Sequence, residues 1–432
     1  MSILASLNTG VSGLRAQGTA MGIIGDNIAN AGTTAFKASR AEFQDVIATN
    51  LKGILGGNQI GRGVRVAGVT SIFQQGDLTA SSRDADMAIR GDGFFVLKNE
   101  VGDGGVSYTR DGSFRFDDKG RLSTSQGLLV QGYKIDEDSG KTVGDVQEIT
   151  FNSNTIPAVG TSQLRVDANL DSRTKINELP FDPATADETA NMTSTVRLYD
   201  TTGTSRTVEM HFYKTGQQEW SWYATADGAV LQGGVDGEST EIASGRLTFN
   251  DDGKLLNDEL LSSNVSFNGA AANQDVDWYF GDAIDSRGGT GEEGATQYGS
   301  DSQVFRQVQD GYAGGTLTNF SVDESGTVSG SYSNGVTKPL AKIALARFEN
   351  NEGLYKVGQN RFQEAVRSGS PLIGEANMAG RGSIMTKTLE GSNVDIASEF
   401  VDMIRTQRNF QANAKTVTTS DELLTDIINL KR

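Results

Sequence analysis

Apolar residues recur at alternating steps of three and four at both ends of the chain, and this repeat constrains the fold most. Steps of three and four place side chains on one face of an α-helix. The sequence therefore predicts a long amphipathic helix at each end. The N-terminal seam is Leu4, Leu7, Val11, Leu14, Gly18, Met21, Gly25 and Ile28, and the C-terminal seam is Ile396, Phe400, Met403, Gln407, Phe410, Ala414, Val417, Asp421, Leu424 and Ile428.

Each predicted helix carries more apolar surface than a two-helix seam needs. An intramolecular coiled coil of the two chain ends is the simplest arrangement. However, further apolar positions widen both faces, and a widened face favours packing between copies of the chain. These positions are Ile3, Ile23, Ile24, Val401, Ile404, Leu423 and Ile427. Ser392, three residues before Asp395, is expected to cap the C-terminal helix.

The interior of the chain has the patterns of β-structure. Residues 94–97, FFVL, form a compact apolar run that is typical of a buried strand. Residues 196–199 and 208–213 alternate as half-buried strands do, with the turn DTTG between them at 200–203. The sequence 220–223, WSWY, predicts a further strand.

One hairpin motif occurs three times. Segments 113–122, 246–255 and 319–328 each place two apolar residues before Asp or Asn, then polar residues, then Gly and an apolar residue. This pattern predicts a β-hairpin with a left-handed Gly in its turn. A calcium loop is disfavoured because the D-x-D-x-D-G spacing and the distal Glu are missing.

The predicted fold class is mainly β with terminal α-helices: paired N- and C-terminal helices, a discontinuous β core domain and an inserted all-β outer domain. The helical domain spans 1–37 and 389–432, and 38–72 is a connecting segment with a loop at 56–63. The β core spans 73–148 and 313–388, and the outer domain spans 149–312. A Gly-rich stretch, 281–302, is expected to be a long exposed loop.

Charge and composition exclude several function classes. The net charge is −17, and residues 149–312 hold 25 acidic and 10 basic residues, so the acidity belongs to the outer domain. An acidic surface disfavours nucleic acid, which needs Lys and Arg to neutralise phosphate. No run of 18 apolar residues predicts a membrane span, and no secretory leader is expected, because the first charge is Arg15.

Candidate catalytic or metal-binding groups are sparse. The chain has one His and no Cys, so a zinc site built from these residues and a His-based triad are excluded. His211 is expected on the solvent side of its strand, beside Glu209 and Tyr213. Adjacent carboxylates at Asp84/Asp86 and 292–293 fit acid–base pairing poorly. The sequence predicts no catalytic residue, metal or cofactor, and hence no enzyme.

The segment NIANAGTTAFK at 27–37 resembles the signature of flagellar rod and hook proteins, N-x-A-N-x-x-T-x-G-F-K. The matching residues are Asn27, Ala29, Asn30, Thr33, Phe36 and Lys37, whereas Ala35 stands where Gly is usual. Residues 89–97 and 108–133 resemble the family's core β domain, and 389–432 resemble its C-terminal helix. The inserted β domain favours the hook branch over the shorter rod subunits.

This resemblance implies a structural subunit of the bacterial flagellar hook, in which many copies form a flexible tube. The paired helices would line the inner tube, and the β domains would form outer shells of a universal joint between rod and filament. It implies export without leader cleavage, an extracellular location, and contacts with the export apparatus and with rod, hook-cap and hook–filament junction proteins. The alternatives are a distal-rod subunit and, from another class, a secreted β-rich adhesin.

Overall fold

The structure is a computed structural model that describes residues 3–46, 49–50, 59–99, 105–136, 140–150 and 155–430. The chain forms two compact units. We call them the core unit, which comprises 1–152, 319–330 and 338–432, and the inserted unit, which comprises 153–318 and 331–337. The predicted outer domain spanned 149–312.

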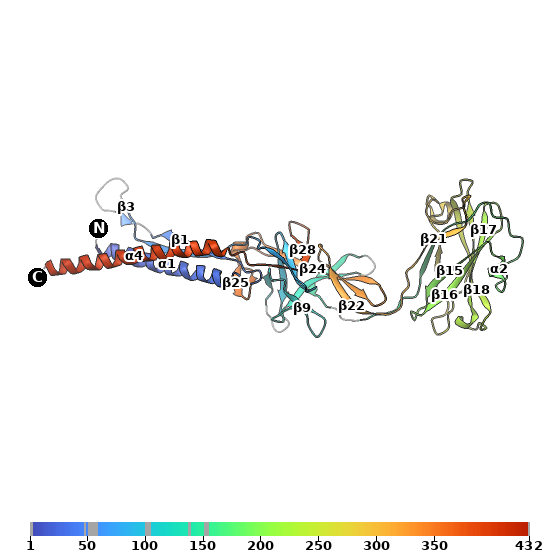
Figure 1. The fold of residues 1–432 in the computed structure, drawn as a ribbon, viewed down its shortest axis with the longest axis horizontal. Coiled ribbons are helices and arrows are strands. Elements are labelled where there is room, and N and C mark those ends of the chain that lie inside the picture. The colour runs from blue at the N-terminus through green and yellow to red at the C-terminus, as the bar shows by residue number, and fades with distance from the viewer. Residues whose placement is uncertain are drawn as a thin grey trace. The chain divides into compact units, whose positions relative to one another are not determined.

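The predicted fold class, mainly β with paired terminal helices, is confirmed. Helix α1 (Ile3–Ala29) and helix α4 (Ile396–Leu430) lie side by side in the core unit (Figure 1). Their contacts run in opposite directions along the two sequences: Ser6 meets Ser420, and Asn27 meets Glu399. The two helices are therefore antiparallel.

The core unit has a β-sheet with a hydrophobic cluster on each side of its central strand, β7 (Phe94–Lys98). Phe94 and Val96 belong to one cluster, and Phe95 and Leu97 belong to the other. Alternate residues of a strand point to opposite faces, so burial on both faces explains the unbroken apolar run. From β23 onward, the strand order of this sheet is β23-β24-β11-β7-β8-β26-β25. Its other strands are β8 (Ser107–Thr109), β11 (Leu129–Ile135), β23 (Thr327–Tyr332), β24 (Thr337–Arg347), β25 (Tyr355–Gly358) and β26 (Arg361–Gln363).

Shorter strands complete the core unit. Strands β9 (Phe114–Phe116), β10 (Leu122–Thr124), β12 (Thr142–Glu148) and β27 (Leu372–Glu375) extend the sheet. Separate antiparallel pairs join β5 (Leu78–Ala80) to β29 (Thr388–Glu390) and β6 (Met87–Arg90) to β28 (Ser383–Thr386). The predicted connecting segment forms the pairs β1 (Ser39–Asp45) with β4 (Val64–Ser71) and β2 (Thr49–Asn50) with β3 (Gln59–Ile60). Of its predicted loop, 56–58 lie outside the described residues.

The inserted unit is built from a five-stranded antiparallel sheet and a three-stranded sheet. Trp222 on β17 packs against Trp278 at 5.3 Å and Phe280 at 5.0 Å between ring centroids. The larger sheet has the order β15 (Met192–Tyr199), β16 (Ser205–Lys214), β17 (Glu219–Asp227), β18 (Ser239–Phe249) and β19 (Leu255–Ser263), and the smaller has β20 (Asp277–Tyr279), β14 (Gln163–Asn169) and β21 (Gln303–Gln309). The inserted unit also contains β13 (Thr155–Ile156), α2 (Ala186–Thr189), η1 (Gly228–Val230) and α3 (Ile284–Arg287). Strand β22 (Gly315–Val322) begins in the inserted unit and ends in the core unit.

The repeated hairpin motif is confirmed at all three places. Gly120, Gly253 and Gly326 have φ of 71°, 78° and 80°, the left-handed region that favours Gly. In each turn the Asp or Asn side chain accepts hydrogen bonds from the backbone N–H groups two and four residues later. The motif is therefore a self-capped turn whose side-chain oxygen is already used by the backbone.

The predicted exposure of His211 is wrong, because its exposed fraction is 1%. The residues of β16 on the predicted inner face are buried, and segment 171–191 covers the other face. In that cover Phe181 stacks on Tyr223 at 3.8 Å, and Thr189 hydrogen-bonds the Tyr213 hydroxyl at 2.8 Å. Burial lowers the pKa of His211, so its imidazole is neutral at pH 7.

The stretch 281–302, which was expected to be a long exposed loop, contains regular structure, and part of it is buried. It contains α3, and its residues Ala283 and Ala295 are buried among the aromatic core of the inserted unit. Thr296 bridges to both Asn169 and Lys254. The Gly residues in this stretch allow tight turns within packed structure, so Gly content alone was a poor guide to exposure.

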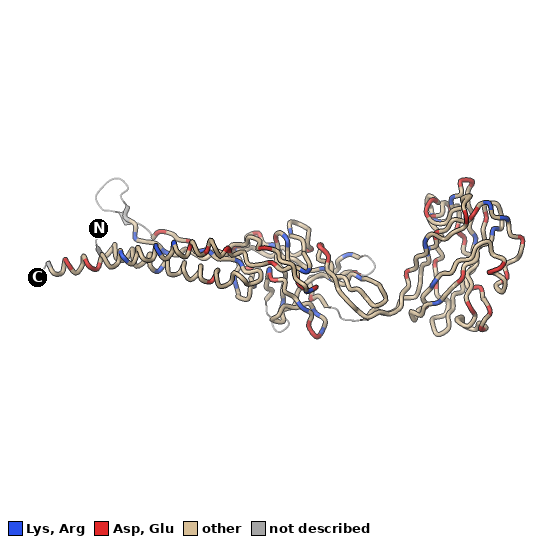
Figure 2. Tube along the Cα trace, in the orientation of Figure 1, with Lys and Arg blue, Asp and Glu red and all other residues tan. Residues whose placement is uncertain are grey.

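Acidic residues occur throughout the inserted unit, as the coloured Cα trace in Figure 2 shows. This distribution agrees with the excess of acidic over basic residues in that part of the sequence. Among the helices that the structure describes, none has the length and apolar character needed to cross a membrane.

We predict that Trp222→Ala destabilises the inserted unit by about 3–5 kcal/mol, because it leaves a cavity between two sheets. The ring lies over Gly245, its cross-strand partner, where an added Cβ would come within 2.6 Å of the indole nitrogen. Chemical denaturation monitored by fluorescence measures the loss. Leu179→Ala, at an exposed side chain, is the control and should change stability by no more than about 0.5 kcal/mol. Equal effects would contradict the assignment of Trp222 to the core.

Candidate assembly interface and its junction with the core

Small residues line the contact between α1 and α4. A Cβ added at Gly10 would lie 2.9 Å from Val417 Cγ2, and one added at Gly13 would lie 2.6 Å from Asn413 Oδ1. Ala20 on α1 is also buried. Because Gly10 and Gly13 have no side chain, the two helices can approach closely, and any larger residue at either position would push them apart. We call this line of residues the small-residue stripe.

The predicted seam of α1 lies beside the small-residue stripe. By the 3.6-residue repeat it is about a third of a turn round the helix. Leu4 is 60% exposed, and the other apolar members are half-buried. These members are Leu7, Val11, Leu14, Met21 and Ile28. Val11 also borders a cavity between α1, strand β4 and Val46, which directly follows β1. Most of this seam therefore has accessible surface in a single chain.

The predicted seam of α4 is divided between the α1 contact and solvent. Met403, Ala414, Val417 and Leu424 are half-buried, whereas Ile396, Phe400, Phe410 and Ile428 are exposed. The face of α4 that packs against α1 also includes polar residues that lie between the seam positions. Two of them, Thr406 and Ser420, are buried. The sequence pattern missed these residues because they are small and polar rather than apolar.

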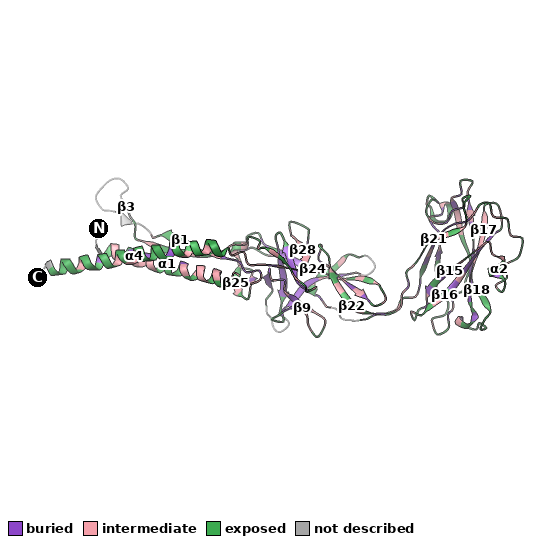
Figure 3. Ribbon diagram, viewed as in Figure 1, coloured by how far each residue is buried: buried purple, intermediate pink, exposed green. Residues whose placement is uncertain are grey.

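Helix α4 presents an unusual amount of apolar surface for a helix of a single chain. Eight of its large apolar side chains are between 38% and 65% exposed, and Figure 3 shows the exposed positions along the helix. They are Ile396, Phe400, Val401, Ile404, Phe410, Leu423, Ile427 and Ile428. Exposed apolar surface on this scale is typical of a site of protein–protein contact.

The expected cap of α4 is wrong by one turn. The Asp395 side chain accepts hydrogen bonds from the N–H groups of Ala397 and Ser398, and Ser398 Oγ donates back to Asp395. Ser392 instead accepts from Val394 N–H in the preceding turn. Asp395 is therefore the N-cap, and hydrogen bonds from Ser398 and the backbone lower its pKa.

Asn27 ties the end of α1 to two other segments. It is buried, and its side-chain N–H group donates to Ser39 O at 2.8 Å and to Glu399 Oε1 at 2.9 Å. Its side-chain oxygen accepts from Ser39 N–H at 2.9 Å. One amide therefore joins α1, the start of β1 and the first turn of α4. Burial raises the pKa of Glu399.

The residues after Asn27 form the turn that leads the chain out of α1. Asn30 donates to Asp26 O, and Thr33 Oγ1 donates to Asn30 Oδ1 at 3.1 Å. Ala29, the last residue of α1, is exposed. Ala35 has φ of 55°, which explains why the signature has Gly at this position: L-residues other than Gly are strained there. Its N–H donates to Glu390 O at 2.7 Å.

Lys37 enters a buried cluster of charges in the core unit. Its Nζ lies 2.5 Å from Glu390 Oε1 and also donates to Gln74 O at 2.7 Å. Arg110 lies 3.5 Å from the other Glu390 oxygen, and all three side chains are buried. Burial lowers the pKa of Lys37, opposed by the charge of Glu390. Phe36 precedes Lys37 in the sequence, and the Lys356 Nζ lies over its ring, 5.0 Å from the ring centroid.

We call this set of contacts, centred on Asn27, Lys37, Glu390 and Glu399, the junction. Lys37 and Glu390 are 353 positions apart in the sequence, so this ion pair ties the N-terminal part of the chain to the C-terminal part. Sequence reasoning singled out Asn27 and Lys37 through their signature. It missed Glu390, Glu399 and Arg110, because no local pattern shows which acidic residue meets a distant Lys.

Four family models match the chain in order. They are a flagella basal body rod protein at 7–37, the flagellar hook protein FlgE/F/G D1 domain at 88–169, the flagellar basal body protein FlaE D2 domain at 169–312, and the flagellar basal body rod FlgEFG protein C-terminal at 385–430. The first model ends at Lys37, where the junction lies. The matches indicate an axial protein of the bacterial flagellum.

Comparison with whole proteins narrows this class. The chain is 34% identical to the flagellar hook protein FlgE of Borreliella burgdorferi over 99% of this chain and 100% of the relative. It is 32% identical to FlgE of Escherichia coli, with 98% of each covered. A crystal structure of Helicobacter pylori flagellar hook protein FlgE2, 15% identical, has the same fold, with a TM-score of 0.51 over 72% of this chain and 100% of that one. The chain belongs to the flagellar hook protein family, and it is a structural subunit of the hook.

We predict that Glu390→Gln destabilises the core unit by about 3–5 kcal/mol, because it leaves two buried cations without a carboxylate. Lys37→Met should cost less than half as much, since Arg110 still neutralises Glu390 and the Met side chain fills the volume. Thermal and chemical unfolding of the two variants would measure the difference. If Glu390 neutralises both Lys37 and Arg110, Glu390→Gln must lose more stability than Lys37→Met. A larger loss for Lys37→Met would refute this assignment.

Proposed function

We propose that the paired helices α1 and α4 form the inner layer of a tube made of many copies of this chain. The observation that carries this proposal is the division of each helix into a face used within the chain and an apolar face left exposed. The small-residue stripe holds α1 against α4. Most of the predicted seam of α1 and the exposed apolar residues of α4 remain available to neighbouring copies.

The exposed surface is large enough to supply the affinity for assembly. Burying a Leu, Ile, Val or Phe side chain fully contributes roughly 1.5–3 kcal/mol. Eight such residues on α4 alone are exposed, so contacts between helices of neighbouring copies would be strong. The entropy lost when the subunits associate offsets part of this favourable burial free energy. In a tube, however, each subunit contacts several neighbours, so the contributions of several interfaces add up.

The β-rich units fit the outer part of such a tube and its ability to bend. The inserted unit carries most of the acidic excess, and contacts between exposed charged surfaces are individually weak. Weak outer contacts can break and form again while the inner helices stay packed. The tube then serves as a flexible universal joint between rod and filament, with rod, hook-cap and hook–filament junction proteins as its neighbours. Its subunits travel through the flagellar export apparatus.

We predict that Phe400→Asp prevents tube formation without changing the unfolding of the β-rich units. Phe400 is 50% exposed in the single chain, so its replacement would remove apolar surface that the proposal assigns to an intersubunit contact and would add a charge. Electron microscopy would show tubes for the unmodified chain and none for the variant. Calorimetry would show unchanged transitions of the core and inserted units.

Phe400→Leu is the matched control and should still assemble, because an apolar side chain remains at the same position. Tubes formed by Phe400→Asp would exclude this face of α4 from the interface. If the variant also lost the core-unit transition, Phe400 would instead belong to the fold of the single chain.

A further inference from the structure

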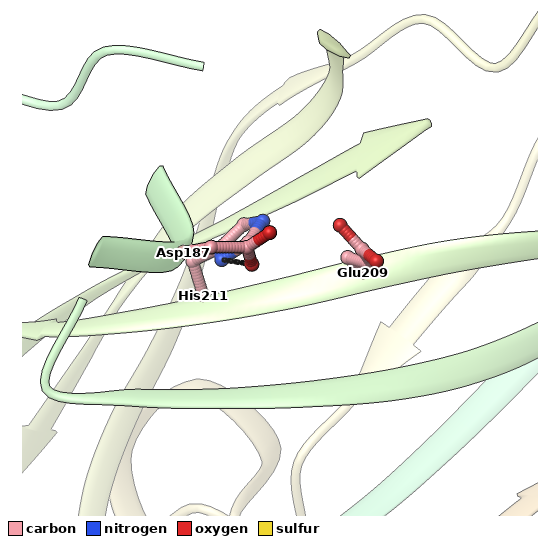
Figure 4. Close-up of side chains that lie close together, drawn as sticks. All are labelled: Asp187, Glu209 and His211. Carbon is pink, nitrogen blue, oxygen red and sulfur yellow. Dashed lines mark ion pairs between the residues drawn. The ribbon is translucent and has the colours of Figure 1, made fainter. Parts of the chain in front are cut away.

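A mixed group of ligand-type side chains lies on the inserted unit, away from the helices. Glu209 and His211 project from the same face of β16, and Asp187 reaches them from α2 (Figure 4). One ligand atom from each residue lies within 4.8 Å of the others. We propose that these three side chains bind a divalent transition-metal ion of the zinc class.

The donor set suits such an ion. Zn²⁺ accepts imidazole nitrogen and carboxylate oxygen at about 2.0–2.2 Å in tetrahedral geometry, so two ligands of one ion lie about 3.4 Å apart. The ligand atoms here lie within 4.8 Å of one another, so they must move closer together to bind one ion. Asp187 can close the difference, because its side chain is 69% exposed and lies on a four-residue helix. Three protein ligands leave a fourth position for water.

The imidazole is held ready to bind. His211 Nε2 lies 2.9 Å from Thr225 Oγ1, and donation from Nε2 to this hydroxyl leaves the lone pair on Nδ1. Nδ1 lies 3.7 Å from Asp187 Oδ1. A metal-bound His commonly donates its second nitrogen to an oxygen in this way, which sets the tautomer and the ring plane. Thr193 Oγ1, 3.3 Å from Nδ1, can rotate its hydroxyl hydrogen away.

The charges of the group favour a cation. Within the part of the chain that the structure describes, neither Asp187 nor Glu209 forms an ion pair with Lys or Arg, and the nearest approach of Asp187 to a nitrogen base is to the His211 ring. No lysine or arginine therefore competes with a cation for these two carboxylates.

A bound ion would connect two parts of the inserted unit. Segment 171–191 covers one face of the five-stranded sheet, and Asp187 belongs to this cover, whereas Glu209 and His211 belong to the sheet. A shared metal would hold the cover against the sheet. Because the ion binds only the folded arrangement, its binding stabilises the inserted unit.

The test uses the full-length, untagged chain, freed of metal with a chelator and labelled with ¹⁵N at His. The chain has one His and no Cys, so any change in an imidazole signal reports on His211 alone. We expect Zn²⁺ to shift this signal, to bind with one ion per chain in calorimetry, and to raise the melting temperature of the inserted unit. An unmoved imidazole signal at millimolar Zn²⁺ would overturn the proposal.

Variants of the carboxylates separate this site from adventitious binding. Asp187→Asn should weaken zinc binding at least tenfold, and Glu209→Gln should do the same. Glu188→Gln removes the same charge at the neighbouring exposed position and should leave the affinity unchanged. His211→Asn removes a buried ring and can unfold the unit, so the decisive comparison is between Asp187 and Glu188. Equal affinity of these two variants would exclude Asp187 as a ligand.

Discussion

The close approach of α1 to α4 is the constraint on which the rest of the core unit depends. Gly10 and Gly13 allow it, because a Cβ at either position would enter the side chain of α4 that lies against it. An apolar stripe would have paired the helices equally well, but it would have used up the apolar surface. Small residues instead pair the helices by backbone proximity and leave the large side chains exposed.

The junction connects the paired helices to the β-rich part of the core unit. Asn27 holds the end of α1 to the first turn of α4, and Lys37 and Glu390 hold the exit turn to the sheet strands. Buried charges cost desolvation energy and rarely add stability over an apolar core. We infer that these buried charges contribute to geometry rather than to stability. Hydrogen bonds between charged groups depend on direction, so this pair restricts the angle at which the helices leave the sheet. A tubular assembly needs that angle to be the same in every subunit.

The periodicity of apolar residues predicted the positions of helices and strands well, but it predicted less well which of their faces are exposed. The helix ranges, the three hairpins and the buried strand at Phe94 all followed from local patterns, because such patterns reflect backbone geometry. His211 was misplaced because alternation assumes that one face of a strand meets solvent, and segment 171–191 covers that face. The α4 cap was misplaced by three residues, since both Ser392 and Asp395 can accept backbone hydrogen bonds and only the folded backbone selects one.

By itself the sequence determined the mainly β fold with helical ends, the acidic character of the inserted region and, through the signature at 27–37, the family. These properties depend on local spacing and composition. Tertiary structure alone decided which face of each helix is used within the chain, that Glu390 is the partner of Lys37, and that Asp187 and Glu209 meet the single His. Such contacts join residues far apart in the sequence, and their partners are selected by the packing of whole elements rather than by any neighbour along the chain.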